Sequence, residues 1–196
     1  MKSILALLAL ALVGCASSPP FQSVPLGAKF ELLGAIVQAP NEPDWYLIGV
    51  NQVNLALGKR LPSRSESLIA SSTFFMFEYN ADDDTYLNQI MKERAAKNDA
   101  TRFTVVSVTN ELVDFKGARC FTYKTSSADH GAKGVTGNAT QYLKTMGMVC
   151  RHPSNKAIAV QIEVSHRSPV QEFPTAYLPV ANKFIQELQL VDNKVR

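Results

Sequence analysis

The hydrophobic and polar positions form a succession of short segments that either alternate with a two-residue period or are rich in β-branched and aromatic residues, and both patterns are typical of β-strands. In the cleanest case, residues 156–166, one face carries Ile158, Val160, Ile162 and Val164, and the other carries Ala159, Gln161 and Glu163. That alternation predicts an antiparallel strand with one face toward solvent. We predict further strands at 29–37, 45–50, 53–57, 68–79, 102–109, 111–115, 118–126 and 141–151.

Two segments follow a helical period instead. In the first, apolar side chains recur three, four and eight positions after Leu87, and the acidic residues 82–84 precede them. Acidic residues stabilise the N-terminus of a helix, so we predict a helix that begins near these acids. A second helix is predicted between Tyr177 and Leu188, with prolines around its first turn. The order of elements predicts an α+β fold, a mainly antiparallel sheet with two principal helices packed on it.

This layout resembles the PsbP-like α/β/α sandwich family. A Pro–Trp region follows the first strand at Pro43-Asp44-Trp45, and the last helix carries a Phe-x-x-x-Leu spacing from Phe184 to Leu188. The similarity covers residues 29–191 and concerns the layout of the elements, not a diagnostic motif. It implies an α/β/α sandwich and, as for most of that family, a non-enzymatic binding or assembly role.

The N-terminus has the features of a secretory signal. The positive start Met1-Lys2 is followed by an apolar run from Ile4 to Val13. A run of about ten residues suits a signal peptide, because a membrane-spanning helix needs roughly 20. Leu12-Val13-Gly14-Cys15 then resembles the lipobox of bacterial lipoproteins, in which the cysteine is acylated and becomes the first mature residue. The alternative is an ordinary signal peptide with an incidental cysteine near its cleavage site.

The lipobox divides the chain into four predicted parts. These are a signal peptide at 1–14, an acylated Cys15 with a flexible tether at 15–27, a single α+β domain at 28–192 and a tail at 193–196. Stable anchoring takes more than one acyl chain, and family lipoproteins carry a diacylglycerol and usually an N-acyl chain. In enterobacterial-type sorting, Asp after the cysteine retains a lipoprotein at the inner membrane. Ala16 therefore favours the periplasmic face of the outer membrane over the inner membrane.

Composition and charge exclude some partners. The chain has 196 residues, of which 46% are hydrophobic and 19% charged, as in ordinary globular proteins. Its formal charge is +3, and removal of the signal takes one lysine away. Such a small positive charge argues against nucleic acid as a partner and against a polybasic membrane surface.

The cysteine count depends on the lipobox. Once Cys15 is acylated, Cys120 and Cys150 remain. In an oxidising compartment an even pair predicts a disulfide, and two buried free thiols are the alternative. If 118–126 and 142–151 pair as an antiparallel hairpin in the register that opposes the two cysteines, a disulfide can span them. The bridge would then pin the end of the hairpin that lies away from its glycine-rich tip.

That tip, residues 128–140, is our candidate ligand-contact loop. It holds three glycines, but their spacing matches no phosphate-binding motif, and the loop leads into a strand instead of a helix. We therefore interpret it first as a flexible hairpin turn. Because it is the longest polar loop, we assign possible ligand contacts to His130, Lys133 and Asn138.

No motif names a catalytic or metal site. Residues 82–84 lack the pattern of a calcium-binding loop, so we interpret them as the cap of the first helix. His130, His152 and His166 lack zinc-binding spacing, and we interpret them as surface or strand-end residues. We predict no catalytic residue, no metal and no cofactor.

Two functions remain. The first is a lipid-anchored, non-catalytic binding or assembly module of the cell envelope with a possible protein partner, which predicts an exposed apolar or aromatic groove and no cluster of convergent polar groups. The alternative is an envelope hydrolase that lacks a recognised motif. It predicts a pocket where one of the histidines meets an Asp, Glu or Ser side chain.

Overall fold

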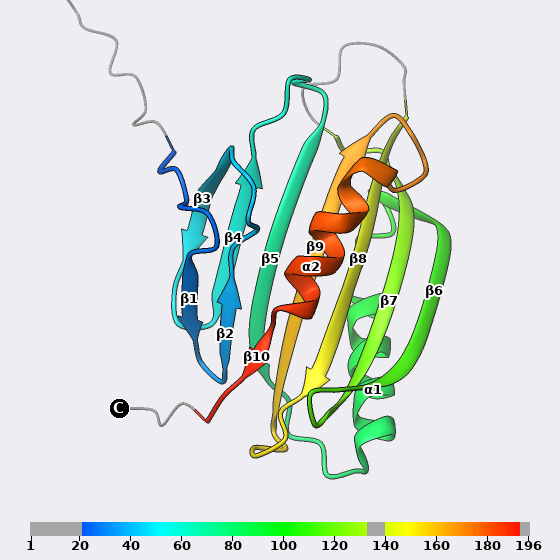
Figure 1. Cartoon of the computed structure of the whole chain (residues 1–196). Coiled ribbons are helices and arrows are strands. Elements are labelled where there is room, and N and C mark those ends of the chain that lie inside the picture. Colours follow the sequence, from blue (N-terminus) through cyan, green and yellow to red (C-terminus); the bar gives the residue numbers. More distant parts are fainter. Residues whose placement is uncertain (1–20, 133–139, 193–196) are drawn as a thin grey trace, which may run out of the picture.

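The structure, a computed structural model, describes residues 21–132 and 140–192 (Figure 1). The main antiparallel sheet has the strand order β3-β4-β5-β9-β8-β7-β6, and a smaller sheet has the order β1-β2-β10. The strands are β1 (Lys29–Leu32), β2 (Ala35–Gln38), β3 (Trp45–Val50), β4 (Asn54–Lys59), β5 (Ser67–Met76), β6 (Phe103–Phe115), β7 (Ala118–Asp129), β8 (Gln141–Arg151), β9 (Ile158–Ser168) and β10 (Gln189–Leu190). The helices are α1 (Asp83–Ala96) and α2 (Leu178–Gln186), and a 3-10 turn at Thr175–Tyr177 leads into α2. The predicted α+β class and mainly antiparallel sheet are confirmed.

The two helices cover opposite faces of the main sheet (Figure 1). Successive side chains of a strand point to opposite faces, so each central strand supplies two cores. Cys120 joins the core beneath α2, whereas its neighbour Phe121 joins the core beneath α1. The α2 core includes Val180, Ala181 and Phe184 from the helix. The α1 core includes Tyr86, Leu87 and Ile90 from the helix.

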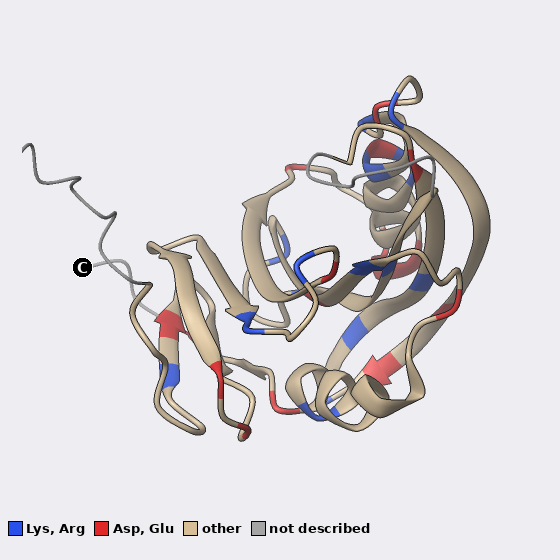
Figure 2. Ribbon diagram, turned by 90° about the horizontal axis from the view of Figure 1, so that it is seen from above, with Lys and Arg blue, Asp and Glu red and all other residues tan. Residues whose placement is uncertain are grey.

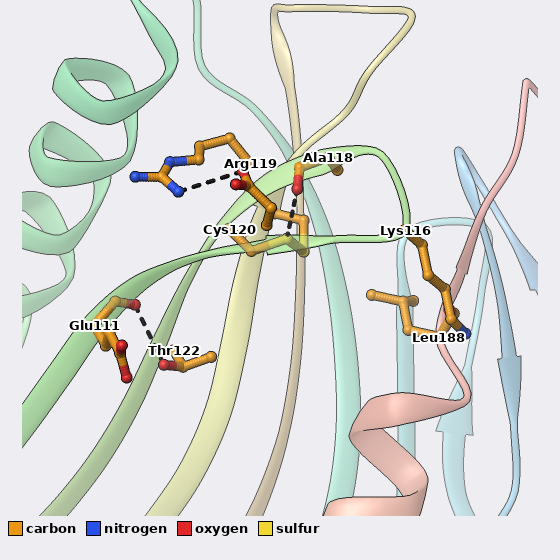
Figure 3. The surroundings of a disulfide bond; sticks show 9 residues. Glu111, Lys116, Ala118, Arg119, Cys120, Thr122 and Leu188 are labelled. Atoms are coloured by element: carbon orange, nitrogen blue, oxygen red, sulfur yellow. Dashed lines mark hydrogen bonds and ion pairs between the residues drawn. A yellow bond between two sulfur atoms is a disulfide. The ribbon is translucent and has the colours of Figure 1, made fainter.

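The hairpin of β7 and β8 contains the predicted disulfide. Cys120 lies directly opposite Cys150 in the register, their Cα atoms are 4.0 Å apart, and the two sulfur atoms are bonded (Figure 3). Both cysteines are fully buried. The bridge sits at the end of the hairpin away from the segment that joins β7 to β8, as the sequence predicts.

A tight turn at Lys116-Gly117 joins β6 to β7 beside this bridge. Both residues have positive φ angles, 48° and 81°, which is the conformation of a two-residue hairpin turn. The turn also holds the end of α2, because Nζ of Lys116 donates to the carbonyls of Gln186 at 2.7 Å and Leu188 at 3.0 Å. Figure 3 shows this side chain extending toward Leu188. A cation at these carbonyls satisfies the helix C-terminus.

Several boundaries differ from the sequence prediction. Residues 29–37 form a hairpin instead of one strand, because Gly34 adopts a φ of 74° and reverses the chain. The two strands predicted between residues 102 and 115 are the single strand β6. The last residues of the predicted tether, 15–27, are already bonded to the domain, since the amide of Val24 donates to the carbonyl of Trp45 in β3 at 2.9 Å. Within the described ranges, no helix is long and apolar enough to cross a membrane.

Gly147 in β8 gives a sharp test of this packing. A Cβ added there would lie 2.6 Å from the Tyr123 hydroxyl and 2.7 Å from the backbone carbonyl oxygen of Ile162. Because a backbone atom cannot move aside cheaply, we expect Gly147→Ala to lower the free energy of unfolding by about 1–3 kcal/mol. Gly49→Ala in β3 is the control, since nothing lies within 4 Å of its added Cβ. Denaturant unfolding that shows equal stability for both variants would contradict the packing.

Candidate functional site

A groove runs along the α2-facing side of the main sheet, between α2 and strands β6 to β8. We call it the α2 groove. It has a volume of about 460 Å³, and a second hollow of about 260 Å³ continues it past Met146 toward residues 171–178. The apolar side chains that line the larger part are Val113, Phe115, Met146, Met148 and Ile185.

Polar groups form the rim of the α2 groove. Thr109 and Glu111 of β6 lie on one side, and Asn182 of α2 lies on the other. The helix itself brings little charge to this wall, because Lys183 is its one charged residue, whereas α1 on the opposite face carries charges of both signs (Figure 2). An apolar floor with a sparse polar rim suits a ligand that presents apolar side chains or chains of carbon.

The strand register explains why the α2 groove forms there. Residues that oppose each other across an antiparallel pair share a face of the sheet. Val113 opposes Cys120, and Thr122 opposes Met148, so these side chains all point toward α2. Helix α2 packs mainly on β8 and β9, and the part of β6 and β7 around Glu111, Thr122 and Lys124 extends beyond it on this face. The exposed strip beside the helix is the floor of the groove.

Beyond the far end of the α2 groove lies a second feature, the polar cluster of Glu66, Lys144, His166 and Ser168. Lys144 and His166 oppose each other across β8 and β9. Nζ of Lys144 donates to Oγ of Ser168 at 2.6 Å and to the carbonyl of Val170 at 2.5 Å. Nε2 of His166 lies 3.2 Å from Oε2 of Glu66. Glu66, His166 and Ser168 line a pocket of about 390 Å³ that Phe173 and Tyr177 close on another side.

Burial sets the charge state of this cluster. Lys144 is 2% exposed and His166 is 1% exposed. Burial lowers the pKa of Lys144 to about 8. The pKa of His166 is also lowered, first by burial and then by the positive charge of Lys144, although the contact with Glu66 opposes this. At neutral pH the cluster therefore holds a charged lysine beside a neutral histidine.

The bonds of Lys144 give it a structural role. Its ammonium group bridges the end of β9 to the carbonyl of Val170, which fixes the chain as it leaves the sheet toward α2. A hydroxyl beside an amine is also the arrangement of a nucleophile and its base. Here Ser168 is 2% exposed and Lys144 is already bonded to a carbonyl. The arrangement favours structure over catalysis.

Lys144 makes a testable contribution to the pH dependence of stability. Its folded pKa of about 8 lies below the ordinary lysine value of about 10.4, so the unfolded chain binds more protons between these values. The free energy of unfolding should therefore rise with pH across that window, by about 1–3 kcal/mol. Lys144→Met should lack this rise. Parallel denaturant titrations at pH 7.5 and pH 9.5 measure the difference, and equal pH slopes for both chains would contradict it.

The structure describes only one of the three predicted ligand-contact residues of the candidate loop. His130 is exposed, its amide donates to the carbonyl of Arg102 at 2.8 Å, and its Nε2 lies 3.0 Å from Oγ1 of Thr104. It therefore contacts the edge strand β6 and is separate from the polar cluster. Lys133 and Asn138 lie outside the described residues, as does Cys15, so their predicted roles stay predictions.

The interpretation of the histidines as surface or strand-end residues is wrong for His166, which is buried inside β9. His152 does follow the end of β8, but it is also buried, and its Nε2 lies 3.2 Å from the carbonyl of Val191. The interpretation of the acidic residues 82–84 as the cap of the first helix is confirmed. Asp82 caps α1 by accepting from the amide of Thr85 at 2.9 Å. Among the described residues, no group of three or more His, Cys, Asp or Glu could hold a metal ion.

Sequence reasoning missed the polar cluster, although the alternation contained its signal. The apolar face of β9 runs through Val160, Ile162 and Val164, and the same two-residue step continues to His166 and Ser168. In β8, Met148, Met146 and Lys144 are two residues apart from one another and therefore lie on the same face of the strand. A polar residue at a position where the pattern demands an apolar one marks a buried polar group.

Comparisons with known proteins bear on the fold. No family model matches the sequence, and no curated protein is similar enough in sequence to match it. The crystal structure of the Saccharomyces cerevisiae Ran-binding protein Mog1p is similar, with a TM-score of 0.50, 10% identity and coverage of 88% of this chain and 97% of that one. A point mutant of protein Mog1 also has a TM-score of 0.50, with 11% identity and coverage of 84% and 96%. At such low identity these similarities show the fold alone. They test neither the lipobox nor the PsbP-like resemblance.

Proposed function

We propose that the protein is a lipid-anchored lipoprotein of the bacterial envelope that acts as a non-catalytic binding or assembly module. Its acylated Cys15 would hold it at the periplasmic face of the outer membrane, and its ligand would be a protein. The α2 groove is the observation that carries this proposal. It is the exposed apolar groove that a binding module needs.

The chemistry of the groove supports a protein ligand. Val113, Phe115 and Ile185 are the half-buried apolar side chains of the groove, and their accessible surface would meet the apolar residues of a partner over the buried Met146 and Met148. The exposed polar rim would set the orientation of that partner. The similar Mog1p structure is described as that of a Ran-binding protein, which makes protein binding compatible with this fold. We infer no Ran-like partner from it.

A photo-crosslinking residue at Asn182 tests the proposal in living envelopes. Asn182 is exposed at the rim of the groove, and Lys92 is exposed on α1, which covers the opposite face of the sheet. We expect one envelope protein, identified by mass spectrometry, to be captured from position 182 and not from position 92. A strain that lacks this protein should lose the crosslinked band. Equal capture from both positions would contradict a specific groove.

The alternative function, an envelope hydrolase, draws on the polar cluster. His166 does meet Glu66 beside a pocket, and Ser168 does contact Lys144, as that alternative requires. The near-complete burial of Ser168 weighs against it. A fluorophosphonate that reacts with activated serines separates the two functions. Covalent labelling of Ser168 would support the hydrolase, and an unlabelled chain supports the binding module.

A further inference from the structure

Strand β6 forms an exposed edge of the main sheet. It is 13 residues long and, within the described residues, pairs only with β7. Val105, Val106 and Val108 are 52%, 42% and 51% exposed, and no charged residue lies between Phe103 and Asn110. Edge strands are usually kept short or protected by charge, since their free backbone groups pair readily with another strand. This edge is long and uncharged at its centre.

A bulge places two of these valines on one face. Val105 opposes Ser127 and Val108 opposes Thr125, and the register shifts between Val105 and Ser107. Ser127 and Thr125 are two positions apart in β7 and so share a face. Val105 and Val108 therefore share that face too, although three positions separate them. The bulge turns the edge into an apolar strip on one face.

We propose that a second copy of this chain pairs with β6, antiparallel and edge to edge. In one register Val105 lies opposite Val108 of the second copy, and Val108 lies opposite its Val105. The same register opposes Thr104 to Thr109. It also brings Glu111 to the level of Arg102, which lies one residue before β6 and already donates two hydrogen bonds to Asp129 of its own chain. The valine and threonine pairs are favourable, because side chains of the same character meet across the seam, and Glu111 approaches a residue of opposite charge.

Charge disfavours one alternative register. In a register centred on Glu111, the Glu111 side chains of the two copies would lie directly opposite each other. Like charges in that position destabilise a strand pair. The proposed pairing joins the two main sheets into one continuous sheet. Opposed residues of an antiparallel pair share a face, so both α2 grooves would open on the same side. Because β6 contributes to each groove, the two grooves would flank the seam.

Cysteine crosslinking of the full-length chain in its own envelope tests this register. In the variant V105C/V108C, each new cysteine would oppose its partner at about 4.5–5.5 Å between Cα atoms, which a disulfide spans. Within one chain the two positions are roughly 10 Å apart, too far for a bridge. Cys120 and Cys150 are already bonded to each other, so they do not compete. We expect most of the double variant to run as a dimer on a non-reducing gel.

The single variants V105C and V108C are the matched controls. In the proposed register each would sit about 10 Å from its own copy, so both should remain largely monomeric. An unchanged melting temperature would show that these exposed positions tolerate the substitutions. A monomeric double variant with unchanged melting would overturn the proposal. Single variants that dimerise as well as the double variant would also overturn it.

Discussion

Replacing both Cys120 and Cys150 with alanine is expected to lower the free energy of unfolding by about 3–4 kcal/mol. The bridge closes a loop with a sequence separation of 30 residues, and opening it gives that conformational freedom back to the unfolded chain. For a domain of this size, such a loss lowers the melting temperature by about 10 °C. Calorimetry or thermal circular dichroism of the purified chain measures the change.

Reduction supplies the control for this prediction. A strong reductant should lower the melting temperature of the wild-type chain and leave the double variant unchanged. Because both cysteines are fully buried, the bond should resist reduction until the chain begins to unfold. A reductant effect of equal size on both chains would mean that the bridge is not the source of the stability.

The second large effect is expected at Cys15. Cys15→Ser should abolish the incorporation of labelled palmitate, since a serine hydroxyl does not replace the acylated thiol of a lipoprotein. It should also move the mature protein from the membrane fraction to the soluble periplasmic fraction, because no other anchor is predicted in the chain. Metabolic labelling combined with fractionation measures both changes.

Ala16→Asp provides the companion test of sorting. If the enterobacterial-type rule applies, this variant should keep its lipid and move from the outer to the inner membrane on a density gradient. Retention of the label by Cys15→Ser would contradict the lipobox interpretation. An uncleaved serine variant is recognised by its larger size, so it is not mistaken for an anchored mature protein.

The sequence predicts the elements of this fold well because the main sheet is built from long alternating strands. Such strands carry their own signal, and β9 is the clearest example. The disulfide also follows from sequence reasoning, once the register opposes Cys120 and Cys150. The strand β10 was missed because two residues are too few to show a period. Gly34 was missed as a turn because the residues around it are apolar.

The candidate site is harder to predict, because it depends on which strands become neighbours. The α2 groove combines residues from β6, β7, β8 and α2, and a local pattern cannot show that part of β6 extends beyond α2. The polar cluster joins Glu66 to His166, which lie 100 positions apart. Periodicity places each of these side chains on a face, but the long-range register decides what it meets.

The binding role of the α2 groove is tested most directly by filling the groove. Asn182→Trp would place an indole at its rim, whereas Lys183→Trp adds the same side chain at the next position of α2, which does not line the groove. Both residues are exposed, so neither change disturbs the core. The measurement is the amount of envelope partner recovered with each chain after chemical crosslinking, because Asn182→Trp occupies the position of the photo-crosslinking residue. We expect Asn182→Trp to reduce recovery at least tenfold and Lys183→Trp to leave it unchanged, and equal recovery with both would contradict a binding function of the groove.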